Sequence, residues 1–341
     1  MIEEKFEREE FEREEFEKSC TEGDLEKLKN LIINHHVSPR WNNDCGVRLA
    51  SKNGHLHILQ YLIEEQECDL HVDNGYALID ATRSNHLHLV KYFFEKLGQN
   101  FICLSNFFYS TSLAIQNNYF EITKFLVDLE SERDLKYSHV RDTQLEANFL
   151  YACECNHLEI VKYILEKITI LNTKADDSYP TQKAINTGFC RAASNGHLTI
   201  VKYLLSQGAN VHVNNDYALR FASWGNYLNV VKFLVEECSV DVQTDENSPM
   251  EWASSKNYYE IMKYLIDKGA PMDHPCVKDN VRFKKYILFC EKNIFKRREK
   301  AQKTIYFWWI PICYSLDHPS GCGKRMMERN VAETFKLFLE K

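Results

Sequence analysis

Residues 195–216 read NGHLTIVKYLLSQGANVHVNND, and this stretch decides the fold because variants of it recur along the chain. It contains a tight Gly-His turn, an amphipathic segment, a Gly stop and a polar connection. A sequence motif repeated at a nearly fixed interval predicts a solenoid, in which each repeat unit packs only on its neighbours. Such a fold favours a function as a binding surface, without naming what binds.

The register of the repeat follows from the apolar residue that opens each amphipathic segment. Successive openings lie 31, 31, 33, 38, 40, 30 and 31 residues apart, close to the roughly 33 expected of one solenoid family. The openings are Leu25, Leu56, Leu87, Phe120, Leu158, Leu198, Leu228 and Tyr259. Six residues before each stands a small residue: Ser19, Ala50, Ala81, Ala114, Ala152, Ala192, Ala222 and Ala253.

Each unit is predicted to be a pair of helices joined by a turn. The small residue lets the first, short helix approach its neighbours. Apolar residues at offsets 0, 2, 3, 6 and 7 then give the second helix a wide buried face. The turn carries Gly or Asn, which tolerate a left-handed backbone. These turn residues are Gly54, Asn85, Asn118, Asn156, Gly196, Asn226 and Asn257.

These features resemble the ankyrin repeat. Residues 217–222, Tyr-Ala-Leu-Arg-Phe-Ala, stand where that family usually has Thr-Pro-Leu-His-x-Ala, and residues 196–198 and 208–210 match its Gly-His-Leu turn and Gly-Ala-Asn hairpin. The resemblance covers about residues 18–280. Its Tyr-Ala-Leu-Arg motif, with Val-Lys-Tyr-Leu in the second helix, looks like the motifs of ankyrin proteins of giant amoeba-infecting DNA viruses (mimivirus-like). The Thr-Pro and the His are missing here, so Arg48 and Arg220 are predicted to replace the hydrogen bonds of that His.

The sequence therefore predicts an all-α ankyrin-repeat solenoid of about eight helix-turn-helix units with short hairpin loops, plus a helical C-terminal segment. The expected units are 18–44, 45–75, 76–106, 107–144, 145–181, 182–216, 217–247 and 248–280. An acidic low-complexity extension, residues 1–17, precedes them and is expected to be solvated. A basic and aromatic cap or docking segment, residues 281–341, follows. The insertions at 131–142 and 173–181 either form binding loops or arose by neutral sequence drift in loops that tolerate added residues.

Composition limits the cellular setting. The net charge of −7 is mild for 341 residues and disfavours wholesale nucleic-acid binding. The twelve Cys are scattered, which is typical of reduced thiols in the cytosol or nucleus. The first residues lack an apolar signal region, and the apolar run near 306–316 is too short to span a bilayer. We expect a soluble intracellular monomer that does not bind membranes, in the host cytoplasm or nucleus if it is viral.

No residue pattern predicts catalysis, a cofactor or a metal. The four turn histidines His55, His86, His157 and His197 lie about one repeat apart, so they are expected to bond locally and not to share an ion. A second candidate, Cys313, His318 and Cys322, supplies only three zinc ligands. Residues 321–324, Gly-Cys-Gly-Lys, lack the leading Gly and the Ser or Thr of a phosphate loop. The protein is therefore predicted not to be an enzyme.

Two ladders of side chains recur in the second helices. Lysines at offset 4 are expected on a solvated convex face, with a phosphate-attracting stripe as the alternative. Aromatic residues at offset 5 are expected to pack between adjacent helices with their hydroxyls in water. The lysines are Lys29, Lys91, Lys124, Lys162, Lys202, Lys232 and Lys263, and the aromatic residues are Tyr61, Tyr92, Phe125, Tyr163, Tyr203, Phe233 and Tyr264.

The resemblance implies a non-enzymatic scaffold that binds a protein, a host protein if the viral likeness holds, through its concave face. Carried over position by position, the candidate partner-binding residues of the first helices are Lys52, Arg83, Gln116, Glu154, Ser194, Trp224 and Ser255. Those of the hairpins are Asp73, Gly75, Asn214, Asp216, Asp245 and Asn247. An exposed Trp224 would dominate such an interface, the alternative being that it packs on the neighbouring turn. Trp252, next to Ala253, is expected in the core.

Two other functions stay open at this point. The chain is an adaptor if residues 281–341 recruit a second complex, such as a ubiquitin ligase, while the repeats select a target. Nucleic-acid binding through the basic run 282–303 is the third reading, and the acidic balance of the whole chain disfavours it.

Overall fold

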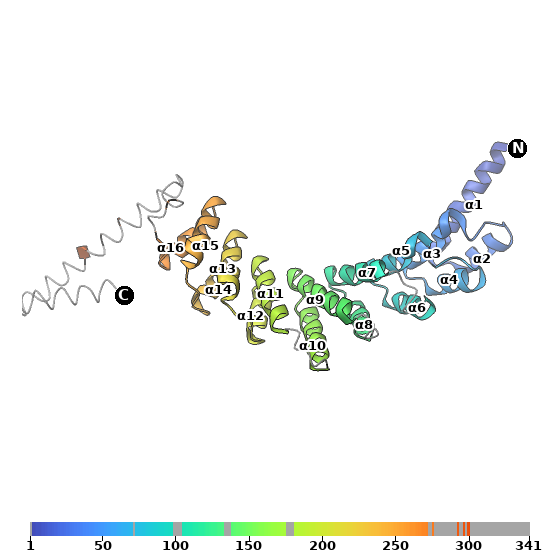
Figure 1. The fold of residues 1–341 in the computed structure, drawn as a ribbon. Coiled ribbons are helices and arrows are strands. Elements are labelled where there is room, and N and C mark those ends of the chain that lie inside the picture. Colours follow the sequence, from blue (N-terminus) through green and yellow to red (C-terminus); the bar gives the residue numbers. More distant parts are fainter. Residues whose placement is uncertain are drawn as a thin grey trace, which may run out of the picture. The chain divides into compact units, whose positions relative to one another are not determined.

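The computed structural model describes residues 2–70, 72–97, 104–132, 138–174 and 181–271, with isolated positions at 275, 292, 296, 299 and 300. The chain divides into two units after Gly269, eleven residues before the predicted end of the array at 280. Every helix named below lies in the first unit (Figure 1). The predicted C-terminal helix, the zinc and phosphate-loop candidates and most of the segment 281–341 lie outside the described residues. So do positions 133–137 and 175–180 of the insertions.

Eight helix pairs follow one another along the described part of the first unit, which confirms the predicted register. The first helices are α1 (Ile2–Glu22), α3 (Trp41–Asn53), α5 (Val72–Arg83), α7 (Leu104–Gln116), α9 (Ser138–Glu154), α11 (Thr181–Ser194), α13 (Val213–Trp224) and α15 (Thr244–Ser255). The second helices are α2 (Leu25–Ile33), α4 (Leu56–Gln60) with a π-helical continuation η1 (Tyr61–Glu65), α6 (Leu87–Leu97), α8 (Phe120–Ser131), α10 (Leu158–Lys174), α12 (Leu198–Ser206), α14 (Leu228–Glu236) and α16 (Tyr259–Asp267).

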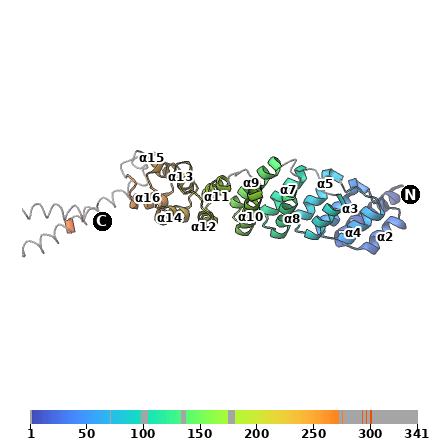
Figure 2. The same ribbon diagram turned by 60° about the horizontal axis from the view of Figure 1, so that its bottom comes forward.

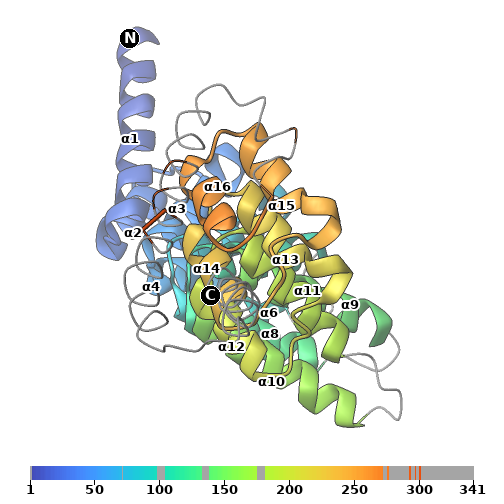
Figure 3. The same ribbon diagram turned by 90° about the vertical axis from the view of Figure 1, so that its left-hand side faces the viewer.

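The pairs stack in chain order. Each first helix packs against the next one, from α1 on α3 to α13 on α15, and the second helices from α6 to α16 do the same (Figure 2). Figure 3 shows α9, α11, α13 and α15 succeeding one another in one layer. All eight small residues of the first helices are fully buried, from Ser19 to Ala253. A larger side chain there would force adjacent first helices apart, because close-packed interiors leave no room for extra methylenes.

The turn between the two helices of a pair has the left-handed backbone that the sequence predicts. All seven predicted turn residues have a positive φ, for example 62° at Asn85 and 79° at Gly196. The next residue often carries a ring that reaches back to the preceding repeat. Nε2 of His197 donates to the carbonyl oxygen of Glu154 at 2.7 Å, and the Tyr119 hydroxyl donates to that of Arg83 at 3.1 Å. The turn histidines thus form structural hydrogen bonds, as expected, but each bonds to a backbone carbonyl of the preceding repeat and not within its own turn.

Left-handed residues kink the first turns of α3 and α13, where the hairpin connection enters the helix. Asn214, Asn215 and Asp216 have φ values of 51°, 54° and 55°, and residues 42–44, Asn-Asn-Asp, adopt nearly the same conformation. Asn and Asp are the non-glycine residues that visit this region most readily. Arg220 donates from Nη2 to the carbonyl oxygen of Asn214 at 2.8 Å, so it supplies the kind of hydrogen bond expected of the missing His.

The acidic N-terminus enters the first repeat without a break. The predicted boundary between residues 17 and 18 falls inside α1, and Phe16, which the sequence places in a solvated extension, is fully buried. Phe11, one five-residue step earlier, is 62% exposed. Five residues advance about 140° around a helix, so the two rings cannot lie on one face. Phe16 therefore belongs to the core of the array.

The two ladders of the second helices meet each other between repeats. The lysine ammonium of one repeat lies 5.1–5.9 Å from the aromatic ring of the next, a cation–π geometry. The pairs are Lys29 with Tyr61, Lys91 with Phe125, Lys124 with Tyr163, Lys202 with Phe233 and Lys232 with Tyr264. The lysine ladder thus contributes to the contact between repeats as well as facing solvent.

Carboxylates tie some of the tyrosines to the preceding repeat. The Tyr92 hydroxyl donates to Glu64 at 3.1 Å, and Lys96 binds the same carboxylate at 2.8 Å. Tyr163 donates to Asp128, which also pairs with Lys167. The expectation that these hydroxyls lie in water is wrong, because the acidic residue eight positions into one second helix lies beside the ring of the next.

These carboxylates make stability depend on pH. Hydrogen bonds from Lys96 and then Tyr92 hold the pKa of Glu64 below its ordinary value of 4.5, and Lys268 does the same for Glu236. A carboxyl with a lowered folded-state pKa stabilises the fold above its unfolded pKa, and this stabilisation is lost as pH falls through the folded pKa. The urea midpoint is expected to fall on acidification below about pH 4.5, and to fall less in Glu64→Gln/Glu236→Gln.

Urea denaturation at several pH values between neutral and acid measures this difference. Glu159→Gln is the matched control, since its carboxylate pairs within its own helix with Lys162 at 2.9 Å. An equal loss of stability on acidification in the double variant and the wild type would contradict the assignment.

Candidate functional site: the first-helix surface

The candidate residues of the first helices occupy one equivalent position, two residues after the buried small residue. Lys52, Arg83, Gln116, Trp224 and Ser255 are exposed there, while Glu154 and Ser194 are half-buried. We call the solvent-facing side of the first helices, to which these positions belong, the first-helix surface. It carries two distinct patches, one charged and one aromatic.

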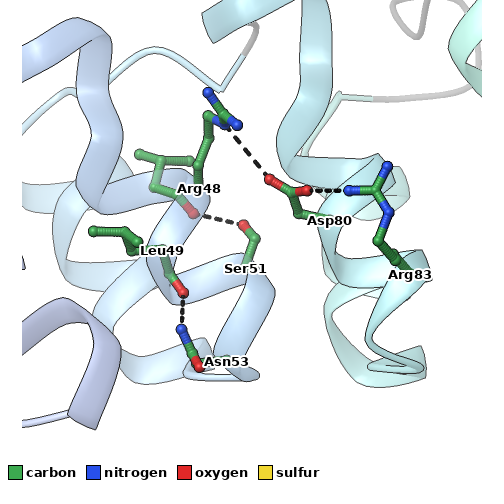
Figure 4. Close-up of polar contacts among 7 residues, drawn as sticks. Arg48, Leu49, Ser51, Asn53, Asp80 and Arg83 are labelled. Atoms are coloured by element: carbon green, nitrogen blue, oxygen red, sulfur yellow. Dashed lines mark hydrogen bonds and ion pairs between the residues drawn. The ribbon is translucent and has the colours of Figure 1, made fainter.

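A charged groove of about 420 Å³ lies between α1, α3 and α5. It brings together two candidates, Lys52 and Arg83, with residues that the sequence did not single out as binding residues. The groove is lined by Glu17, Asn42, Cys45, Arg48, Leu49, Lys52, Asp80, Arg83 and Ser84. Figure 4 shows Asp80 between the guanidinium groups of Arg48 and Arg83.

The anions of this groove lie deeper than its cations. The Asp80 side chain is 9% exposed, while those of Arg48 and Arg83 are 42% and 49% exposed. Asp80 accepts from Arg83 Nη1 at 2.9 Å on one oxygen and from Arg48 Nε at 3.5 Å on the other. The groove therefore presents positive charge to solvent above a carboxylate that is already bonded on both oxygens.

Glu17 and Cys45 form the other wall of the groove. Glu17 Oε1 accepts from the indole N–H of Trp41 at 3.3 Å and from the Cys45 thiol at 3.7 Å. Burial, and then the Glu17 charge, raise the pKa of the Cys45 thiol to about 12. A thiol with so high a pKa holds almost no nucleophilic thiolate near neutral pH, so Cys45 is part of the wall and not a reactive group.

An aromatic patch lies on α13 and α15. Tyr217, Phe221 and Trp224 follow the spacing i, i+4, i+7 and therefore share one face of α13. The rings of Tyr217 and Phe221 stack with centroids 3.8 Å apart, and Trp252 of α15 meets Phe221 edge-on at 4.7 Å. Trp224 is 47% exposed. Its predicted exposure is confirmed, while the prediction that Trp252 belongs to the core is wrong, since this ring is only half-buried.

Cations border the aromatic patch. The Lys256 ammonium lies 5.6 Å from the Trp224 ring centroid, and the Arg220 guanidinium lies 6.0 Å from that of Tyr217. Between the two patches, Glu154 pairs with Arg191 at 2.7 Å. The sequence signal for the aromatic patch was the i, i+4 pair of aromatic residues that precedes Trp224.

The candidate residues of the connections are largely engaged in local contacts. Asp216 accepts from Nδ1 of His212 at 2.7 Å, and Asp245 accepts from Arg220 of the preceding repeat at 2.5 Å. Asn214 is exposed, with its carbonyl bonded to Arg220. Gly75 lies within α5 with a φ of 80°. The side chains of Asp73 and Asn247 lie outside the described residues.

Two kinds of site are missing from the residues that the structure describes. They contain no group of three or more His, Cys, Asp or Glu placed to hold a metal ion. No described helix has the length and apolar character needed to cross a membrane.

A family model described as ankyrin repeats (three copies) matches residues 17–103 and 189–276, just over half of the chain. The chain belongs to the ankyrin repeat family. Both patches lie within the matched segments, because the charged groove draws on residues 17–84 and the aromatic patch on residues 217–252. Ankyrin repeats form a protein–protein interaction domain and are generally not enzymes.

The chain is similar to ankyrin repeat proteins of large DNA viruses. It is 26% identical over 124 residues to the putative ankyrin repeat protein L675 of Acanthamoeba polyphaga mimivirus, covering 36% of this chain and 23% of that protein. It is 22% identical over 213 residues to the putative ankyrin repeat protein FPV031 of fowlpox virus, covering 55% and 60%. Alpha-latrocrustotoxin-Lt1a of Latrodectus tredecimguttatus is 29% identical over 131 residues, covering 37% and 9%. The matched part is therefore at most three fifths of each relative.

Proposed function

We propose that the protein is a non-enzymatic scaffold that binds a protein partner through its first-helix surface, with the aromatic patch as the main contact. The observation that carries this proposal is the half-exposed Trp224, whose ring lies beside that of Phe221 at the edge of the aromatic patch. Trp, Tyr and Arg dominate measured protein–protein hot spots. The similarity to viral ankyrin proteins supports a host protein as the partner.

The pre-ordered rings favour this patch as a binding centre. Phe221 is held between Tyr217 and Trp252, so its position is fixed before any partner arrives. Trp224 has only two side-chain torsions to restrict on binding. A rigid aromatic surface therefore loses little conformational entropy when it is covered, and covering it removes apolar area from water.

Hydrogen exchange tests the location of the interface. With a partner recovered by affinity capture from the native cell, amides of α13 and α15 are expected to exchange at least about tenfold more slowly in the complex. Those of α12 and α14 should change little. The second helices α12 and α14 pack on each other in the same region of the array but lie outside the first-helix surface, so they serve as internal controls. Protection confined to the second helices would refute the proposal.

The adaptor function, with residues 281–341 recruiting a second complex such as a ubiquitin ligase, stays a prediction because that segment lies almost entirely outside the described residues. The same holds for nucleic-acid binding through residues 282–303. Deleting residues 281–341 separates an adaptor from a pure scaffold. An adaptor would lose its second complex and keep its target, whereas a pure scaffold would keep its full set of partners.

A further inference from the structure

The charged groove between α1, α3 and α5 is lined by more cationic than anionic side chains. Arg48, Lys52 and Arg83 bring three positive charges to it, against the two negative charges of Glu17 and Asp80. Both carboxylates are engaged inside the wall, Asp80 with the two arginines and Glu17 with Trp41 and Cys45. Lys52 is exposed and forms no ion pair with any described residue.

The relative exposure of the charged groups decides whether the groove suits an anionic or a cationic ligand. An approaching group meets the exposed ammonium of Lys52 and the half-exposed guanidinium of Arg83 before it reaches the 9% exposed Asp80. A cation would be repelled by the groups that it meets first. The site therefore suits an anion, and a guanidinium offers further N–H donors in the fork geometry that carboxylates and phosphates accept.

The same arrangement favours a single negative charge over two. Asp80 lies beneath the cations and neutralises one of them, so a phosphate dianion placed above it would face a like charge with little surplus to compensate. A carboxylate needs only the charge that Lys52 adds. Beside the groove, Tyr76 is 45% exposed with the Arg48 guanidinium 5.6 Å from its ring centroid, which leaves ring surface for an apolar neighbour.

We propose that the charged groove binds an acidic segment of the protein partner, with an Asp or Glu carboxylate between Lys52 and Arg83 and an apolar or aromatic neighbour on Tyr76. This proposal rests on the proposed function, since it names the chemistry of the bound protein. It places a second contact on α3 and α5, separate from the aromatic patch on α13 and α15.

Fluorescence anisotropy with the full chain tests the groove without the natural partner. The probe is a labelled peptide with the core Glu-Glu-Phe-Glu-Glu, compared with a Gln-Gln-Phe-Gln-Gln peptide and a peptide carrying phosphoserine at two of the Glu positions. At low salt the Glu peptide is expected to bind about tenfold more tightly than the Gln peptide. This preference should shrink as salt shortens the screening length.

Variants assign the binding to particular residues. Lys52→Gln is expected to weaken the Glu peptide about fivefold, and Lys52→Gln/Arg83→Gln about twentyfold. Asp80→Asn keeps the shape of the side chain and removes the competing charge, so it should tighten binding about threefold. Lys183→Gln, an exposed lysine of α11 outside both patches, is the matched control and should have no effect. Thermal midpoints of all variants show that each is folded.

The outcomes separate this proposal from the proposed function. Equal affinity for the Glu and Gln peptides, or no binding of either, would overturn the groove assignment. So would a loss of affinity in Lys183→Gln as large as that in Lys52→Gln. Binding of the phosphopeptide more than about tenfold tighter than the Glu peptide would replace the carboxylate by a phosphate. If the groove variants act as expected while hydrogen exchange shows no protection of α13 and α15, the groove stands and the aromatic patch fails as the main contact.

Discussion

Replacing Phe149 by alanine is expected to lower the free energy of unfolding by about 4 kcal/mol, the usual range for a large aromatic side chain removed from a packed core. Phe149 is fully buried on α9. A Cβ added at Gly188 of α11 would come within 2.7 Å of the ring carbon Cε1, so the ring lies directly against the backbone of the next first helix. Its loss leaves a cavity between adjacent repeats.

The position of Phe149 in the middle of the array shapes the unfolding curve. In a solenoid, stability is a sum over repeats and the interfaces between neighbours, so a weak interface in the centre separates the two halves. We expect the urea transition of Phe149→Ala to occur at lower urea and to split into two. Circular dichroism follows both halves. Tryptophan fluorescence does so too, since Trp41 lies in α3, before the weakened interface, and Trp224 and Trp252 lie after it.

Phe11→Ala is the matched control for this cavity. The Phe11 ring is 62% exposed on α1, so its removal is expected to change the free energy of unfolding by less than about 0.5 kcal/mol. A single transition with the wild-type midpoint in Phe149→Ala would mean that the ring does not fill the interface between α9 and α11. An equal loss in both variants would point to a general effect of removing Phe.

The parts of the fold that depend on one residue at one position could be predicted from the sequence. A left-handed turn needs Gly or Asn, and Gly54, Asn85 and Gly196 adopt it as expected. Close contact between first helices needs a small side chain, and Ala50 and Ala222 are fully buried. Each requirement is local and recurs in every unit, so the regular spacing of these residues predicted the eight helix pairs.

The parts that depend on which side chains meet across repeats could not be predicted. Trp252 stands beside a buried Ala, yet its ring turns onto Phe221 because the preceding repeat offers an aromatic face there. The Tyr92 hydroxyl finds Glu64, twenty-eight residues earlier, since adjacent second helices bring them together. Asp80 became visible as a groove residue only once α3 and α5 were placed side by side. The acidic residue recurs at the same offset, as in Glu64, Asp128 and Glu236, but its meeting with the next aromatic ring follows only from how neighbouring repeats pack.

Replacing Trp224 by alanine is expected to weaken partner binding by about 3 kcal/mol, or roughly a hundredfold in Kd. The side chain is 47% exposed in the free protein, so covering it removes a large apolar area from water on binding. Stability should fall by less than about 1 kcal/mol, because the ring fills no cavity and its contacts with Phe221 and Lys256 are peripheral. Titration calorimetry with the captured partner, alongside thermal unfolding, measures both quantities.

A loss of binding without a loss of stability separates a contact residue from a packing residue. Ile33→Ala is the matched control, since Ile33 is 60% exposed at the end of α2, away from the first-helix surface, and should leave Kd unchanged. Adding Arg83→Ala to Trp224→Ala should weaken binding further, by a nearly additive amount, because α5 and α13 belong to different repeats and the two side chains share no partner. Unchanged affinity in Trp224→Ala would remove the aromatic patch from the interface. A matching drop in thermal stability would assign Trp224 to packing on the neighbouring turn.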